Sequence, residues 1–206
     1  MARIINWLAL AAGILTLIVL LISLYTPWWQ LTVGQNLVKI NASPVNTNFG
    51  VFGNQFAIPM IWALNLITIL TFSASGIIML IYSLVPTKPY AKHLLSFSYK
   101  KPLYSVVSFV AVLAIVLLIA GHFGMYLPIN GSATVTLPGS LTMGATVSAV
   151  ISGTFQLPFF VAVAAATLCI IARVFHGYVV KPQIPPEATT ASTITALPNP
   201  KGTPQQ

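Results

Sequence analysis

Four long apolar runs alternate with more polar segments along this chain. They cover residues 4–25, 59–85, 103–127 and 158–180. A helix needs about 20 apolar residues to cross the hydrocarbon core of a bilayer, and each run is long enough. None of the runs contains Asp or Glu, and their one basic residue, Arg173, is near the end of the last run, where its side chain can reach the membrane interface. The pattern predicts four membrane-spanning helices.

The two longer connecting segments, 26–58 and 128–157, alternate in the way that β-strands do. The first contains "WWQLTVGQNLVKI", and the second contains "SATVTL" and "LTMGATVSAV" separated by a Pro-Gly-Ser turn. A lone two-stranded hairpin is only marginally stable, so we expect both segments to share one sheet. The predicted fold class is an all-α membrane protein, a four-transmembrane-helix bundle with a small extracellular β-sheet formed by two outer loops.

The basic residues predict the orientation of the helices. Lys39 lies in the first long segment, whereas the other eight of the nine Lys and Arg residues fall on the opposite side of the spans. These eight are Arg3, Lys88, Lys92, Lys100, Lys101, Arg173, Lys181 and Lys201. Because cytoplasmic loops carry the excess of basic residues, we expect both termini and the inner loop 86–102 to be cytoplasmic, in a multi-pass protein of the cell membrane.

Two N-x-S/T sequences lie in the segments that this orientation places outside. They are Asn41-Ala42-Ser43 and Asn130-Gly131-Ser132. Asn41 and Asn130 are therefore glycosylation candidates.

The chain divides into a four-span membrane domain, 1–180, and a tail, 181–206. The tail is rich in Pro, Thr and Ala and has little apolar mass with which to fold. We expect it to be a disordered cytoplasmic segment.

Composition narrows the classes of partner. The 206 residues are 57% hydrophobic and 5% charged, whereas soluble domains carry roughly 25% charged residues. The net charge of +8 does not predict nucleic-acid binding, because the bases follow the topology and are not clustered with stacking aromatic residues. The expected partners are the lipid bilayer and other membrane proteins, or further copies of the chain.

Residues that could carry chemistry are few. Cys169 is the one cysteine, so no disulfide forms within the chain. His122 is predicted at the outer side, which separates it from His93 and His176 at the inner side. His93 and His176 share a side, but the placement of His93 in the inner loop makes them a poor pair of haem ligands. We expect no catalytic residue, no metal site, no cofactor and no enzymatic activity.

Two polar features leave alternatives open. The second apolar run carries a polar stripe that begins with Asn65 and Thr68, which fits either interhelical hydrogen bonds or a polar pocket. A quinone contact from His122 is the other open alternative.

The two halves of the chain share an order of features. Tyr25 and Pro27 after the first run match Tyr126 and Pro128 after the third. This order fits a repeated unit of helix, outer loop and helix, and it also fits convergence, because Tyr favours membrane interfaces and Pro favours helix ends.

A family resemblance rests on a few positions. Trp28 and Trp29 open the first outer loop, and Gly50-Val51-Phe52 follows about two dozen residues later. In these positions and in its four-span layout the chain resembles claudin/PMP22-type tetraspan proteins, although the cysteine pair of that family is absent. The resemblance implies outer loops that form a small sheet, but it does not carry an activity over.

Anchoring at the membrane interface explains one tryptophan but not two adjacent ones. We expect Trp28, Trp29 and Phe52 to attach the outer sheet to the helices. The predicted function is that of a non-enzymatic structural, scaffolding or cell-surface interaction component. The alternative is an accessory subunit or small carrier in a respiratory or transport complex.

Overall fold

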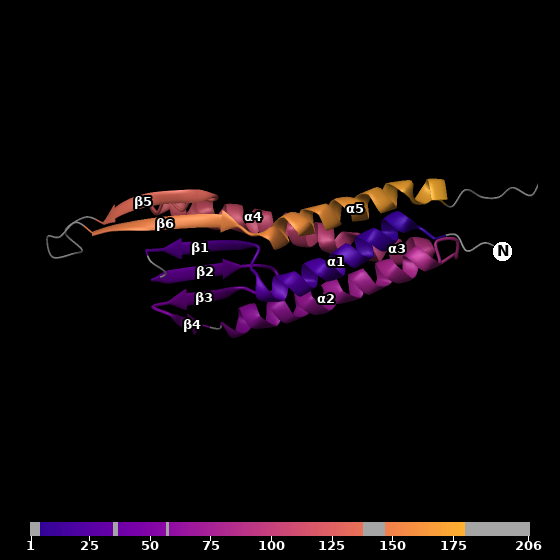
Figure 1. The fold of residues 1–206 in the computed structure, drawn as a ribbon, viewed down its shortest axis with the longest axis horizontal. Helices are drawn as coiled ribbons and strands as arrows, with labels where there is room; N and C mark the ends of the chain where they lie inside the picture. The colour runs from indigo at the N-terminus through magenta and orange to yellow at the C-terminus, as the bar shows by residue number, and fades with distance from the viewer. Residues whose placement is uncertain (1–4, 35–36, 57, 138–146, 180–206) are drawn as a thin grey trace, which may run out of the picture.

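The computed structural model describes residues 5–34, 37–56, 58–137 and 147–179. The predicted tail, 181–206, lies outside these residues. Helices α1 (Trp7–Tyr25), α2 (Pro59–Leu84), α3 (Ala91–Ser98), α4 (Lys100–His122) and α5 (Leu157–Val179) run along the long axis of the molecule, with a sheet at one end (Figure 1).

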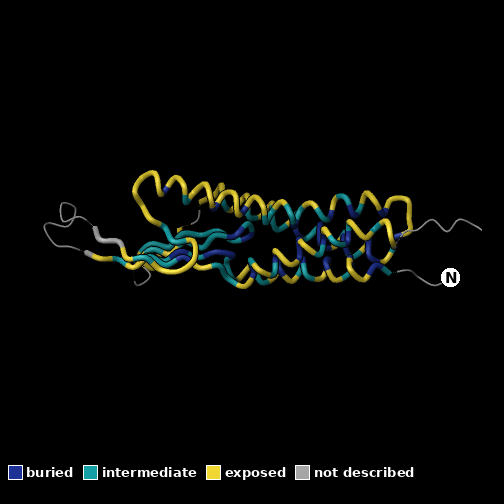
Figure 2. Tube along the Cα trace, turned by 90° about the horizontal axis from the view of Figure 1, so that it is seen from above, coloured by how far each residue is buried: buried dark blue, intermediate teal, exposed yellow. Residues whose placement is uncertain are grey.

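Four helical segments are long and apolar enough to cross a membrane, as the hydrophobic pattern predicts. They are α1, α2, α5 and the run Ala91–His122, which joins α3 to α4. Their outward sides are exposed along the length of the bundle, whereas the buried positions lie between the helices (Figure 2).

Helix α4 ends five residues before the predicted end of the third span. Gly124 adopts a left-handed conformation with φ 74°. Gly124 N–H donates to the carbonyl of Gly121 at 3.0 Å, and Met125 N–H donates to the carbonyl of Ala120 at 2.9 Å. This closing pattern is the usual way in which a left-handed glycine stops a helix.

The short helix α3 corrects the prediction that residues 86–102 form a loop. Its buried positions are Ala91, Leu95 and Ser98, spaced as one face of a helix. Ser75 Oγ on α2 donates to the carbonyl of Ser98 at 2.6 Å, which holds α3 against α2. Basic residues are interspersed with the apolar positions of this segment, so its apolar face was not recognised from the sequence.

The sheet has six strands: β1 (Trp29–Val33), β2 (Val38–Ala42), β3 (Asn48–Val51), β4 (Asn54–Phe56), β5 (Gly131–Leu137) and β6 (Val147–Phe155). Their order is β4-β3-β2-β1-β6-β5, and all neighbours are antiparallel. The pairing of β1 with β6 joins the two long segments, so the shared sheet is confirmed. A sheet of this size makes the all-α class too narrow, because the molecule is mostly helical with a six-stranded antiparallel sheet.

The helices pack unevenly around α1. Helix α1 lies along both α2 and α5, and α4 lies along α5, whereas α2 and α4 touch only sparsely. Close approach of α1 and α2 depends on small residues: a Cβ added at Gly76 would lie 2.6 Å from Leu17 Cδ2, and one added at Gly13 would lie 2.9 Å from Leu80 Cδ2. The separation of α2 from α4 leaves room at the sheet end of the bundle.

Candidate functional site

Trp28 lies fully buried where the sheet meets the helices. Its indole N–H donates to Ser23 Oγ, near the end of α1, at 2.7 Å. Its ring packs edge-on against Phe109 of α4 and Phe159 of α5, with centroid separations of 5.2 and 6.2 Å. Trp28 lies just before β1, and its side chain thus contacts three helices, α1, α4 and α5.

Trp29 joins the two long segments to each other. Its indole N–H donates to the carbonyl of Ile129 at 2.8 Å. Gly153 on β6 makes room for this contact, because a Cβ there would lie 2.0 Å from the carbonyl oxygen of Pro128 and 3.2 Å from the Trp29 ring. Gly153 was missed from the sequence, since a glycine in a strand gives no sign of which backbone approaches it.

Phe52 does not attach the sheet to the helices, which corrects the prediction made for it. Its side chain is 75% exposed, in the two-residue turn between β3 and β4. That turn lies at the end of the strands away from the helices (Figure 1). The Trp28 ring fills the space between the sheet and the helices. Because β3 pairs with β4, residue 52 lies in their turn, away from that space.

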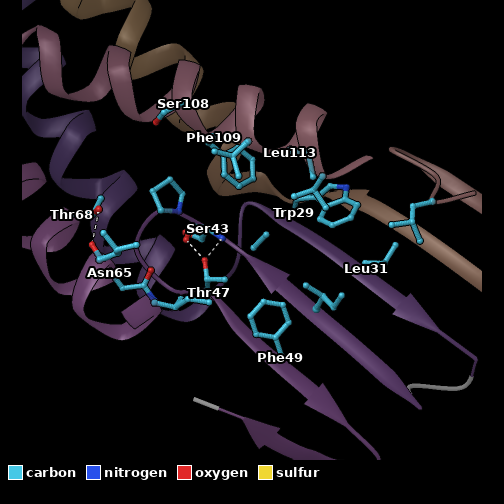
Figure 3. Close-up of a pocket in the computed structure, with 18 residues that line it drawn as sticks. Trp29, Leu31, Ser43, Thr47, Phe49, Asn65, Thr68, Ser108, Phe109 and Leu113 are labelled. Carbon is cyan, nitrogen blue, oxygen red and sulfur yellow. Dashed lines mark hydrogen bonds between the residues drawn. The ribbon is translucent and has the colours of Figure 1, made fainter. Parts of the chain in front are cut away.

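A cavity of about 520 Å³ lies between one face of the sheet and helices α2 and α4. Residues of β1, β2, β3 and the β2–β3 connection form one wall, and residues of α2 and α4 form the others (Figure 3). The lining is mostly aliphatic and aromatic, and none of its described residues is charged. Leu64 and Val112, which line the cavity, are about half exposed, so the cavity is open at the surface of the bundle.

The polar residues of this lining differ in how their hydrogen bonds are satisfied. The hydroxyls of Thr68 and Ser108 donate to the carbonyls of Leu64 and Ser105 on their own helices, at 2.9 and 3.3 Å. In contrast, the Asn65 carboxamide makes no side-chain hydrogen bond to any described residue.

Ser43 and Thr47 on the sheet wall are also satisfied within the chain. The Thr47 hydroxyl donates to the carbonyl of Ser43, and Ser43 Oγ accepts from Val45 N–H at 3.2 Å (Figure 3). Asn65, in the predicted polar stripe, is therefore the polar lining residue whose side chain makes no hydrogen bond within the described part of the chain.

The three histidines are dispersed over the fold. His122 is exposed at the end of α4 beside Phe123, and His93 is exposed on α3. Among the described residues, no three His, Cys, Asp or Glu side chains gather where they could hold a metal ion. Cys169 is buried and free.

His176 belongs to a polar cluster at the end of the bundle opposite the sheet. The Tyr82 hydroxyl lies 2.7 Å from His176 Nδ1 and accepts from Asn6 Nδ2 at 3.2 Å. Asn6 also caps α1 by accepting from Ala9 N–H at 3.2 Å. The cluster joins α1, α2 and α5. No spacing pattern could reveal it, because its members are far apart in the chain.

The two glycosylation candidates differ in setting. Asn41 lies within β2, where its Nδ2 donates to Asn48 Oδ1 at 2.9 Å and its Oδ1 is buried without a partner among the described residues. Asn130 is exposed just before β5, whereas Asn48 holds the side-chain nitrogen of Asn41.

Comparison with known proteins adds no assignment to this geometry. No protein-family model matches the sequence, and no curated protein matches it significantly.

Proposed function

We propose that this chain is a non-enzymatic, multi-pass protein of the cell membrane whose sheet lies outside and mediates contact with a neighbouring membrane protein or a second copy. Both termini are then cytoplasmic. The four-span layout that resembles claudin/PMP22-type proteins supports this proposal at the level of topology.

Exposed aromatic residues at both ends of the helices support the membrane placement. Tyr and Trp concentrate at the two interfaces of a bilayer. At the sheet end they are Tyr25, Trp62 and Tyr126, and at the other end Trp7, Tyr104 and Tyr178. Trp7 and Tyr25 bound the 19-residue helix α1, about 27 Å long at 1.5 Å per residue, close to the thickness of the hydrocarbon core.

The charge distribution supports the sheet being outside. In the described residues Lys39 lies on β2, whereas Lys88, Lys92, Lys100, Lys101 and Arg173 belong to segments at the other end of the bundle. A cytoplasmic location of the basic end follows from the positive-inside rule.

The observation that carries the contact function is the backbone of Phe52. Its φ is 50° and that of Gly53 is 80°, which are the two left-handed positions of a two-residue hairpin turn. Asn or Gly suits the first of these positions, and a bulky aromatic residue is strained there. A strained and exposed phenylalanine does not stabilise the fold of the single chain. We therefore infer that the ring of Phe52 binds a partner outside this chain.

Replacing Phe52 with Asn tests the proposal without endangering the fold. Phe52→Asn removes the ring and favours the turn, so the unfolding temperature stays equal or rises. Native gels of gently solubilised membranes should show the wild-type protein in an assembly larger than the 206-residue chain, and Phe52→Asn should release the monomer. Phe123→Asn is the matched control, because Phe123 is 72% exposed in another part of the molecule.

A wild-type protein that runs as a lone monomer would contradict the contact function. The same conclusion follows if Phe52→Asn and Phe123→Asn both leave the assembly intact. Recovery of respiratory or transport subunits, or of a bound chromophore, would instead favour the accessory-subunit alternative.

A further inference from the structure

We propose that the cavity between the sheet and helices α2 and α4 binds an uncharged membrane lipid. The Asn65 carboxamide hydrogen-bonds a hydroxyl or carbonyl of the lipid, and the hydrocarbon lies along the aromatic and aliphatic walls. This inference needs α2 and α4 to lie in the bilayer, and it is independent of contact through Phe52.

The position of the cavity gives a lipid access from the side. Helices α2 and α4 touch only sparsely, and the cavity lies between them. Leu64 and Val112 line the cavity and are 53% and 59% exposed, so the cavity opens at the surface of the bundle. In a bilayer this opening meets lipid tails, so a tail can enter without passing through water.

The depth of Asn65 matches the polar part of an uncharged lipid. Trp62 is exposed near the start of α2, where an interfacial aromatic residue is expected. Asn65 lies three residues further along α2, about 4.5 Å along the axis. The hydroxyls and ester carbonyls of glycerolipids lie just inside the headgroup level, so they can reach the Asn65 carboxamide.

The state of Asn65 calls for a hydrogen-bonding ligand. An amide without a partner is costly to place at the edge of the hydrocarbon, whereas Thr68 and Ser108 already use helix carbonyls. A carboxamide both donates and accepts, which suits a hydroxyl or an ester.

The walls exclude a charged headgroup from the cavity. None of the described lining residues carries a charge that could pair with a phosphate. Trp29, Phe109 and Leu113 form apolar surface for the hydrocarbon (Figure 3). The volume of about 520 Å³ lies within the range of small-molecule sites, roughly 300–1,000 Å³.

Photolabelling of the full chain in lipid nanodiscs tests the site. The probe is a diacylglycerol with a diazirine in one acyl chain, and phosphatidic acid with identical chains is its charged counterpart. Mass spectrometry should locate the diacylglycerol adducts on lining residues of β1, α2 and α4. Labelling by phosphatidic acid at these residues should stay near background.

Three variants separate the polar contact from the cavity itself. Asn65→Leu keeps the branched shape of the side chain without its polar atoms and should lower the labelling roughly fivefold to tenfold, the effect of one lost hydrogen bond. Val112→Trp fills the mouth and should bring the labelling to background. Val110→Trp is the matched control, since Val110 is exposed on α4 but does not line the cavity.

Adducts spread evenly over all four helices would overturn the site, and so would full labelling of Val112→Trp. Labelling that survives Asn65→Leu, or equal labelling by phosphatidic acid, would overturn the assigned recognition of an uncharged lipid. These readouts hold for a monomer as well as for an assembly, so they are distinguishable from failure of the contact function.

Discussion

At the scale of single residues, Trp28 and Phe52 are two large apolar side chains of the first long segment that lie in opposite surroundings. The structure buries Trp28 completely and leaves Phe52 exposed. The difference arises from the hairpin of β3 and β4, whose two-residue turn points residue 52 away from the bundle, and hydrophobicity alone does not encode that direction.

Gly153 makes the sharpest residue-level prediction. A Cβ there would lie 2.0 Å from the backbone oxygen of Pro128, which cannot move as a flexible side chain can. Gly153→Ala should therefore push residues 128–130 away and weaken the bond from Trp29 to Ile129, destabilising the fold by about 1–3 kcal/mol. In a thermal-unfolding assay in detergent, this corresponds to a fall of roughly 2–12 °C.

Gly121→Ala is the matched control for Gly153→Ala, because no atom lies within 4 Å of a Cβ added at Gly121. Ala also favours the helix, so the unfolding temperature should stay equal or rise slightly. Equal unfolding temperatures for both variants would show that the close approach at Gly153 is relaxed in solution.

The Tyr82 hydroxyl joins three helices and makes a second residue-level prediction. Tyr82→Phe removes the partner of both Asn6 Nδ2 and His176 Nδ1, leaving polar groups unsatisfied between helices. We expect a loss of about 1–3 kcal/mol in stability, measured by thermal unfolding. Tyr178→Phe, at an exposed tyrosine of α5, should change nothing, and a similar loss in both variants would contradict the role of the cluster.

At the scale of elements, periodicity predicted the spans well and their ends less well. Helix α2 begins at Pro59 as predicted, because proline marks a first helical position. Helix α4 ends at His122, before the left-handed Gly124, although the apolar run continues to Leu127. The face of α3 was hidden among basic residues, and the cavity could not be predicted because it depends on the distance between α2 and α4.

Attachment of the sheet to the bundle gives a prediction at this scale. Trp28→Ala should cost about 3–5 kcal/mol, because it empties the space between α1, α4 and α5. Trp28→Phe should cost less, since it removes the bond to Ser23 but keeps much of the packing. Urea-induced or thermal unfolding should rank the variants in this order, with exposed Trp62→Phe near wild type. A wild-type result for Trp28→Ala would refute the anchoring role.

Strand position also separates the two glycosylation candidates. Asn130 is exposed before β5, whereas the Nδ2 of Asn41 is bonded to Asn48 within the sheet. In a host that glycosylates such sites, Asn130→Gln should remove the glycan-dependent gel shift and Asn41→Gln should not. The opposite result would mean that glycosylation precedes formation of the sheet at Asn41.

At the scale of the whole molecule, the uneven packing of the helices explains where the cavity lies. The repeat suggested by the sequence would relate α1 to α4 and α2 to α5 by a twofold axis. If that relation held throughout, α2 would pack on α4 as closely as α1 packs on α5. Instead α1 and α5 lie along each other, and α2 and α4 touch only sparsely. The sequence hints at the common order of the hairpins, but the departure from symmetry depends on packing details such as the close approach at Gly13 and Gly76.

The orientation of the molecule can be tested with single cysteines. Cys169→Ala supplies a cysteine-free background, and the native thiol is buried in any case. Ser132→Cys, exposed on β5, should react with an impermeant maleimide in whole cells, whereas Ser96→Cys on α3 should react only after the cells are permeabilised. The physical reason is the positive-inside rule, which predicts that the five described bases keep the α3 end of the bundle on the cytoplasmic side. Labelling of Ser96→Cys but not Ser132→Cys in intact cells would reverse the orientation, place the sheet and Phe52 inside, and turn the search for their partner to the cytoplasm.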